Sequence, residues 1–354
     1  MTSKYEGIAD KLETEIRQMM RDGRDRLPSE SDLCSKYSCS RQTVRMALSL
    51  LEDRGMIVKK KGSGSFIAPR VSSNANTVFF ITEDEDRYTS PAFIQGLKAL
   101  LHGRKFELKC FSTNGFVSTE GEILRKAVRE MPFALIIEPL HNVIPNPNIP
   151  LILEARSKGI PVIYLNSAYR FPEDSLLISA DNTEGAEMLM RHLAQEGHKR
   201  IGGIFRIDDT EGLEKYKGCM KACNELGLPF DETGYYLFRT DELNDLIRGE
   251  RGFLRRFADG CLRNKTAVIC HDDMIAYQLI TMIRKGGKRV PEDIAVVSFD
   301  NSYYAAQGDV GITSAGLPER SLARACADAV FAIADGKTYR SRRLPWEITV
   351  RKSG

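Results

Sequence analysis

Three short motifs near the start of this chain constrain its fold more than any other feature. They are R-L-P-S-E at residues 26–30, S-R-Q-T-V-R at 40–45 and K-K-K-G-S-G-S-F-I at 59–67. A serine hydroxyl can accept a hydrogen bond from the backbone N–H groups that a helix leaves free at its start, so Ser29 and Ser40 predict two capped helices. Gly62 and Gly64 favour a tight turn between two strands. We therefore expect two short helices followed by a basic hairpin.

The basic surplus of the chain is concentrated in its first segment. The whole chain holds 51 Lys and Arg against 48 Asp and Glu, and its net charge is +3. Residues 1–70 contain 14 basic and 10 acidic side chains, a surplus of 4, so the remaining residues sum to −1. Within residues 36–61 the numbers are 7 and 2. A local surplus of this kind predicts a surface for a polyanion such as nucleic acid.

The helix predicted after Ser40 has one face suited to a core and another suited to DNA. Four apolar residues recur on the first face at helical spacing: Val44, Ala47, Leu48 and Leu51. Arg41, Gln42 and Arg45 point elsewhere; arginine fits the O6/N7 edge of guanine, and glutamine fits the N6/N7 edge of adenine. Thr43 suits a phosphate or a thymine methyl group, and the lysines of the hairpin suit the neighbouring backbone. The segment therefore predicts a reader of duplex DNA.

From Thr77 the pattern changes, after a small, polar stretch at 71–76 that we interpret as a linker. Short apolar runs now alternate with helical repeats, which is typical of parallel α/β sheets. The predicted strands are 78–81, 108–111, 135–137, 162–165, 201–207, 267–270 and 294–299, and the predicted helices include 93–102, 185–195, 216–226 and 275–284. One sheet would need too many strands, so we predict two lobes with a ligand cleft at the carboxyl ends of the strands.

The first segment, residues 4–68, resembles the winged helix-turn-helix of the GntR family of bacterial regulators. The strings R-L-P-S-E, S-R-Q-T-V-R-M-A-L and G-S-G-S-F-I carry the resemblance. By position, the DNA contacts of that family fall on Lys4, Glu30, Arg41, Gln42, Thr43, Arg45, Lys61 and Gly62. The resemblance implies that the third helix enters the major groove while the first residues and the hairpin contact phosphates.

The remainder of the chain resembles a different family, the sugar-binding domain of LacI/GalR regulators, which is itself similar to periplasmic sugar-binding proteins. The matching segments are 180–186, 193–202, 270–276 and 290–301. The fold class predicted for the whole chain is therefore α/β, with an α+β winged helix at the start. The predicted boundaries are 1–70 for the DNA-binding domain, 71–76 for the linker and 77–354 for the effector and dimerisation domain, with lobe 1 at about 77–180 and 314–338 and lobe 2 at about 183–312 and 340–354.

Polar side chains at the ends of predicted strands are the candidate effector ligands. A sugar needs fixed hydrogen-bond acceptors and donors together with an aromatic wall. The candidates are Tyr88, Phe93, Glu138, Asn166, Arg206, Lys215, Asp272 and Asp300. Lys215 stands where these sugar sites usually have an arginine, and Asp272 where asparagine is commoner. We interpret these two departures as a compensating charge pair.

These features predict a one-component transcriptional regulator, most simply a repressor, that binds operator DNA as a homodimer. Closure of the lobes around a sugar, with L-arabinose first and another simple sugar next, would lower its operator affinity. The same regulator with a nucleobase or sugar-phosphate effector is an alternative, because Arg206 and Lys215 leave a phosphate possible. A sugar-active enzyme with a DNA-binding module is a further alternative.

Several classes of protein are disfavoured by the sequence. It contains no Ser/His/Asp set, glycine-rich phosphate loop or metal-ligand spacing, so we expect neither catalysis, nor a cofactor, nor a metal. The eight cysteines are scattered without paired spacing, which favours free thiols. No apolar run reaches the roughly 18 residues that a membrane span needs, so we expect a cytoplasmic protein without a membrane partner.

Overall fold

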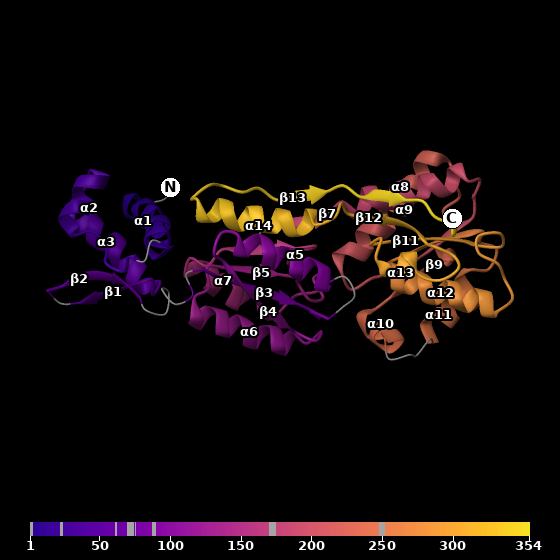
Figure 1. Cartoon of the computed structure of the whole chain (residues 1–354), viewed down its shortest axis with the longest axis horizontal. Coiled ribbons are helices and arrows are strands. Elements are labelled where there is room, and N and C mark those ends of the chain that lie inside the picture. Colours follow the sequence, from indigo (N-terminus) through magenta and orange to yellow (C-terminus); the bar gives the residue numbers. More distant parts are fainter. Residues whose placement is uncertain are drawn as a thin grey trace.

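The computed structural model arranges the chain as three bodies in a row: a small amino-terminal head followed by two α/β lobes (Figure 1). It describes residues 3–21, 24–60, 62–68, 74, 76–86, 90–169, 175–247 and 252–354. The amino terminus lies in the head and the carboxyl terminus in the second lobe. No helix among the described residues is long and apolar enough to cross a membrane.

The head contains three helices and a hairpin: α1 (Lys4–Arg21), α2 (Glu30–Tyr37), α3 (Arg41–Asp53), β1 (Ile57–Lys60) and β2 (Gly64–Ile67). Both predicted caps are confirmed. The hydroxyl of Ser29 accepts from the backbone N–H of Asp32 at 3.2 Å, and that of Ser40 accepts from the N–H of Thr43 at 3.2 Å. The apolar face of α3 is buried as predicted, and the hairpin pairs Ile57 with Ile67. Local capping and turn chemistry therefore account for the head.

Lobe 1 is built on a six-stranded parallel sheet with the order β13-β7-β6-β5-β3-β4. Its strands are β3 (Thr77–Thr82), β4 (Glu107–Ser112), β5 (Ala134–Ile137), β6 (Val162–Leu165), β7 (Leu176–Ala180) and β13 (Arg342–Leu344). Helices α5 (Ser90–His102) and α14 (Ser321–Ala334) cover one face, and α6 (Val117–Glu130) and α7 (Ile149–Ser157) cover the other. Alternate residues of β3 and β5 enter these two apolar cores, as the two-residue period of a strand requires.

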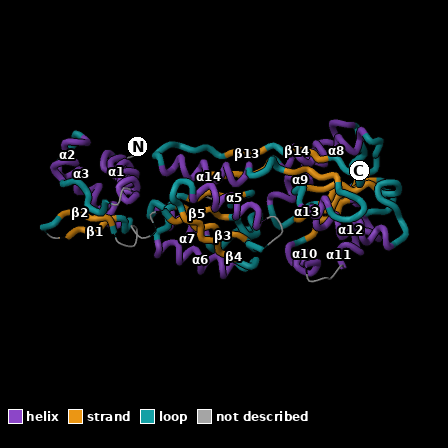
Figure 2. Tube along the Cα trace, viewed as in Figure 1, coloured by secondary structure: helices purple, strands orange, loops and turns teal. Residues whose placement is uncertain are grey.

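Lobe 2 has the same plan around a sheet with the order β14-β12-β11-β10-β8-β9. Its strands are β8 (Ile201–Arg206), β9 (Tyr235–Phe238), β10 (Ala267–Cys270), β11 (Ala295–Phe299), β12 (Thr313–Gly316) and β14 (Glu347–Thr349). Helices α8 (Asn182–Gln195) and α9 (Thr210–Leu226) cover one face; on the other lie α10 (Thr240–Ile247), α11 (Gly252–Arg256) and α12 (Asp273–Lys285). Three short helical segments complete the described part of the lobe: η1 (Glu232–Gly234), η2 (Phe257–Cys261) and α13 (Tyr303–Ala306). Figure 2 shows the strands of each lobe enclosed by helices.

The seven predicted strands are all present, and the described parts of the lobes contain five further strands that the sequence did not predict: β7, β9, β12, β13 and β14. Two of them change the lobe boundaries. Strand β12 belongs to the sheet of lobe 2, so the chain crosses after Gly316 and not at about residue 314. Strand β13 pairs with β7 in lobe 1, so the return crossing follows Leu344 and not residue 340. The parallel arrangement has one exception, because the edge strand β14 runs antiparallel to β12.

Three chain segments cross between the lobes, at Ala180–Asn182, Gly316–Ser321 and Leu344–Glu347. The backbone N–H of Asp181 donates to the carbonyl of Leu344 at 2.9 Å, which ties two of these crossings together. The three crossings form a hinge. The carboxyl ends of the strands in both sheets face each other across this hinge. Loops from the two lobes therefore meet in one cleft.

Candidate functional site

The predicted DNA contacts gather at the start of α3. Arg41, Gln42 and Arg45 are exposed there, whereas Thr43 is half-buried and its hydroxyl lies 2.8 Å from that of Ser40. The Nε of Arg45 donates to Glu30 at 3.0 Å, and the Arg45 side chain is 68% exposed. Glu30 therefore holds one hydrogen-bonding edge of Arg45 and leaves the rest of the guanidinium free to enter a groove.

The other predicted DNA contacts lie at the edges of the head. Lys4 is exposed at the first position of α1, and Gly62 lies at the hairpin tip with a φ of +76°, a conformation that glycine adopts without strain. Lys61 lies outside the described residues. The sequence reasoning missed Arg26, which pairs with Phe66 in a β-bridge and places its guanidinium 5.8 Å from that ring. The R-L-P-S-E motif therefore adds a cation beside the hairpin.

The cleft between the lobes contains three of the predicted effector ligands. Glu138, Asn166 and Arg206 line one small cleft with a cavity volume of about 30 Å³. Glu138 follows β5, and its carboxylate accepts from Thr82 Oγ1 at 2.6 Å and from Asn166 Nδ2 at 3.0 Å. Both donors are neutral groups, and the carboxylate lies at the cleft wall. This geometry suits the recognition of hydroxyl groups.

Arg206, at the end of β8, is the central cation of the cleft. It forms an ion pair with Asp209, and its Nη1 lies 3.5 Å from Glu83 Oε2 in the opposite lobe. Burial disfavours its charge, but these neighbouring carboxylates outweigh that effect and raise the pKa of Arg206 above its usual range. Asp209 also caps α9 by accepting from the N–H of Gly212 at 2.7 Å. The guanidinium is thus held charged and in one orientation.

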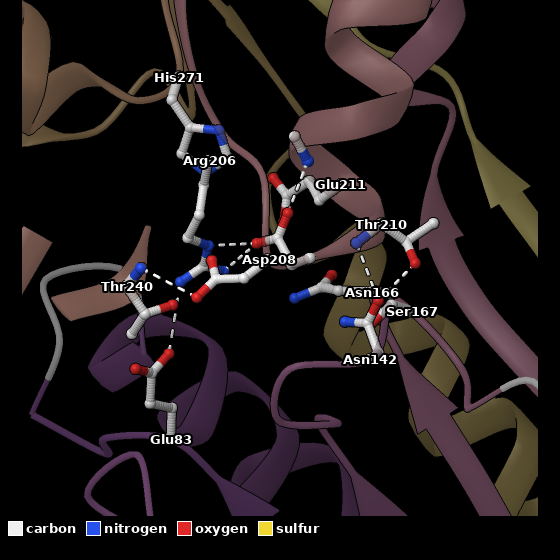
Figure 3. Close-up of polar contacts among 12 residues, drawn as sticks. Glu83, Asn142, Asn166, Ser167, Arg206, Asp208, Thr210, Glu211, Thr240 and His271 are labelled. Atoms are coloured by element: carbon white, nitrogen blue, oxygen red, sulfur yellow. Dashed lines mark hydrogen bonds and ion pairs between the residues drawn. The ribbon is translucent and has the colours of Figure 1, made fainter. Parts of the chain in front are cut away.

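Further contacts across the cleft join loops that are distant in sequence (Figure 3). The N–H of Thr210 in lobe 2 donates to Asn142 Oδ1 in lobe 1 at 2.8 Å, and the Asn142 amide donates to Ser167 at 2.8 Å. His141 Nδ1 lies 3.4 Å from Asp208 Oδ2, which also accepts from the N–H of Thr240 at 3.0 Å. Each lobe therefore supplies polar groups that meet on the same side of the hinge.

The other lobe 2 candidates lie behind the cleft wall. Lys215 is fully buried; its Nζ donates to Glu211 Oε1 at 2.7 Å and to the carbonyl of His271 at 2.9 Å, and it lies 4.4 Å from the Phe299 ring. Asp272 caps α12 through the N–H of Ile275 at 2.8 Å. The ion-pair partner of Lys215 is thus Glu211, where the sequence suggested Asp272.

Asp300 lies close enough to Lys215 and Asp272 for their charges to influence it. Burial raises the pKa of Asp300 to about 7, and Lys215 opposes that rise. Of these three residues, Lys215 is the one that donates a hydrogen bond to Glu211 and so orients it.

Of the two predicted aromatic residues, only Phe93 is among the residues that the structure describes, and it does not line the cleft. Phe93 packs in the core of lobe 1, with its ring 5.3 Å from that of Phe80, and does not belong to the described cleft lining. This position is explained by helical spacing, because α5 turns residue 93 toward the sheet. Tyr88 lies outside the described residues.

Several residues of the cleft were missed by the sequence reasoning. They are Glu83, His141, Asn142, Ser167, Asp208, Glu211 and Thr240. Glu83 and Asp208 follow β3 and β8 within two residues, so the strand-end rule that selected Glu138 could have found them. Thr240 follows β9 within two residues, but the sequence did not predict that strand, and Asn142 lies farther along a loop, where spacing carries no signal.

Comparisons with known proteins match the two parts of the chain separately. Residues 4–67 match the bacterial regulatory proteins of the gntR family, and residues 190–354 match a periplasmic binding protein-like domain. The arabinose metabolism transcriptional repressor of Halalkalibacterium halodurans is 29% identical over 326 residues, which cover 90% of this chain and 86% of that relative. The repressor of the same name from Geobacillus stearothermophilus is 28% identical over 318 residues, which cover 89% and 86%.

Solved structures share the fold at lower identity. The transcriptional regulator CelR in complex with cellobiose has a TM-score of 0.69 and 20% identity, and the match covers 100% of both chains. A periplasmic binding protein/LacI transcriptional regulator from Alkaliphilus metalliredigens, complexed with D-xylulofuranose, has a TM-score of 0.66 and 16% identity over 78% of this chain and 98% of that one. The predicted combination of a GntR-type head with a two-lobed binding domain is confirmed.

Proposed function

We propose that this chain, a sugar-binding transcriptional regulator with a gntR-family head and a periplasmic-binding-protein-like domain, is a repressor that releases operator DNA when a sugar closes its cleft. L-arabinose is the first candidate effector, because two relatives that span most of the chain are named for arabinose metabolism. Other simple sugars come next.

The observation that carries this proposal is the supply of acceptors in the cleft. Glu138 presents a carboxylate that is held by neutral donors, and Oδ1 of Asp208 is buried without a hydrogen-bond partner among the described residues. A buried acceptor without a donor costs free energy, which a ligand hydroxyl would recover. A small polyol supplies several such hydroxyls.

The charge of the cleft favours a neutral effector over a sugar phosphate. The described lining contains five carboxylates, of Glu83, Glu138, Asp208, Asp209 and Glu211, and its full cation, Arg206, is already paired with two of them. A phosphate would meet repulsion from the remaining acids in a partly desolvated site. The sugar-phosphate alternative is therefore the weaker candidate, and the nucleobase alternative has no observation in its favour.

On DNA, we propose a homodimer that places one α3 in each of two successive major grooves of a pseudo-palindromic operator. Sedimentation of the free protein and of its operator complex measures this assembly. One dimer per operator is the expected stoichiometry, and one monomer per operator would refute it.

The effector is tested by a thermal-shift screen of L-arabinose, D-xylose, D-galactose and L-arabinose 5-phosphate, followed by gel shifts on the operator. A true effector at about 100 times its Kd should stabilise the protein by about 2.7 kcal/mol and lower operator affinity roughly 5–150-fold. Operator binding that no bound sugar weakens would contradict induction. Chromatography of the sugar after long incubation should recover it unchanged, as expected for a regulator and not for a sugar-active enzyme.

A further inference from the structure

The head touches lobe 1 through helix α1, at a place where lobe 1 presents two glycines. Gly159 follows α7 with a φ of +75°, and a Cβ built there would lie 2.2 Å from Glu13 Oε1. Gly336 follows α14 with a φ of +69°, and a Cβ there would lie 2.8 Å from Thr14 Cγ2. Side chains at these two positions would obstruct α1. Residues 159–162, Ile333 and Gly336 are called the head socket below.

The contact between α1 and the head socket combines apolar and charged groups. The buried apolar cluster of the head is continuous with that on the α6–α7 face of lobe 1, and it includes Ile160 of the socket. Beside it, Asp10 and Glu13 of α1 and Arg156 of lobe 1 line one cavity. Two buried surfaces that share one apolar cluster are typical of a specific contact between domains.

Glu13 also connects the head socket to the DNA-reading helix. The Nη1 of Arg54 donates to Asp10 Oδ1 and to Glu13 Oε2, each at 3.1 Å. Arg54 is the residue that ends α3. The carboxylate that contacts Gly159 is therefore one ion pair away from the helix that carries Arg41 and Arg45.

Two rigid elements join the head socket to the effector cleft. Strand β6 begins at Val162 in the socket and ends at Leu165, directly before Asn166 and Ser167 in the cleft. Helix α14 begins directly after a crossing between the lobes and ends just before Gly336. Figure 1 shows α14 running along lobe 1 from the side of lobe 2 toward the head. A change in lobe closure can therefore reach both sides of the socket through elements that do not bend.

We propose that the head socket is a docking site for α1 of the same chain, and that docking through Glu13 and Thr14 transmits the state of the cleft to α3. The docking itself requires no ligand. Only its role in the response to a sugar rests on the function proposed above.

The docking is tested by hydrogen exchange of the full-length protein without a ligand. Gly159→Asp places a carboxylate against Glu13, and aspartate tolerates a positive φ better than most residues. Gly227→Asp is the matched control: Gly227 has a φ of +63° and no atom within 4 Å of its would-be Cβ. We expect exchange in segments 8–16 and 155–163 to become about threefold faster or more in Gly159→Asp and to stay unchanged in Gly227→Asp. Equal exchange in both variants and the wild type would overturn the docking.

A second measurement does not depend on a destabilising change. Thr14→Cys combined with Gly336→Cys should form a disulfide on oxidation, because the two positions fall within the Cβ separation of about 3.5–4.5 Å that the bond needs. Peptide mapping should identify the linked pair, with Thr14→Cys alone as the control. Absence of the linked peptide would count against the docking.

A third measurement tests whether the docking transmits the state of the cleft to α3. If L-arabinose weakens operator binding of the wild type, Gly159→Asp should still bind the sugar in thermal-shift assays but lose at least about half of the fold-change in operator affinity. A full response in Gly159→Asp would refute transmission and leave the proposed effector standing. No response to L-arabinose in the wild type would refute the effector, while the exchange and disulfide results would still decide the docking.

Discussion

Single residues of the head are placed by local chemistry, and Arg45 is the clearest case. Its Nε is held by Glu30 at 3.0 Å, across the turn between α2 and α3. The pair joins two predicted contact positions that lie 15 residues apart in the chain. Glu30 therefore orients an arginine, a role that neither position reveals alone.

We predict that Arg45→Ala weakens operator binding by about 1–3 kcal/mol and relaxes the preference for one base pair, because a bidentate contact to guanine is lost. Fluorescence anisotropy on the operator and on an unrelated duplex measures both effects. Arg289→Ala, which removes an exposed cation of lobe 2 that pairs with Asp293, is the control. An equal loss on both duplexes would assign Arg45 to phosphate contact.

Asp300 shows the opposite behaviour, since its properties come from tertiary burial. Its backbone has a φ of +96°, and its N–H donates to the carbonyl of Ala315 at 2.7 Å. Burial raises the pKa of this carboxyl from 3.8 to about 7. The folded protein therefore binds more protons here than the unfolded chain between about pH 4 and 7, so stability falls as pH rises through that window.

We predict that Asp300→Asn gains stability over the wild type as pH rises from 4.5 to 7.5. The gain should reach about 1–4 kcal/mol, because one pKa unit corresponds to about 1.4 kcal/mol. Urea unfolding at several pH values measures it. Parallel stability curves for the two proteins would show that Asp300 is not the responsible group.

At the scale of elements, two glycines allow α9 to pack closely against its neighbours: Gly212 faces β8, and Gly218 faces α8. A Cβ at Gly212 would lie 1.8 Å from the carbonyl oxygen of Arg206, and one at Gly218 would lie 2.4 Å from that of Thr183 in α8. Backbone atoms cannot move aside for an added Cβ as the end of a flexible side chain can. The helix that carries Thr210, Glu211 and Lys215 therefore has one position relative to the cleft.

We predict that Gly212→Ala destabilises the protein by about 2 kcal/mol or more and weakens effector binding, because α9 must shift away from β8. Gly260→Ala is the control, since Gly260 lies in the same lobe with no atom within 4 Å of its would-be Cβ. Urea unfolding and thermal shift with the effector provide the two measurements. Wild-type stability in Gly212→Ala would disprove the tight packing.

At the scale of the whole molecule, polar contacts join the two lobes across the cleft. Asn142 is central, because its amide oxygen accepts from Thr210 in lobe 2 while its nitrogen donates to Ser167 in lobe 1. Glu83 and Arg206 add a second bridge at 3.5 Å. Both contacts join lobe 1 to lobe 2 across the cleft.

We predict that Asn142→Ala weakens effector binding about 5–30-fold, in line with the loss of one or two buried hydrogen bonds, and leaves operator binding without effector unchanged. Isothermal titration and gel shifts measure the two affinities. Asn224→Ala, which removes an exposed amide of α9, is the control. A loss of operator affinity in the absence of effector would mean that Asn142 supports the DNA-binding form as well.

Local patterns were sufficient to predict the head, seven of the strands and three residues of the cleft lining. Serine caps, apolar periodicity and strand ends act over a few residues, and their physics does not depend on the remainder of the chain. The sequence did not predict the edge strands β13 and β14, because each is three residues long and has little apolar content. Phe93 was assigned to the wrong surface, because helical rotation directs it toward Phe80.

The sequence by itself determined which local units form and which chemistry each of them carries. Only the tertiary structure decided which units meet: Asn142 with Thr210 across 68 residues, and Glu13 with the head socket. The physical reason is that these contacts depend on the relative positions of separately folded bodies. Those positions are set by packing at the hinge and at the head, which local spacing does not encode.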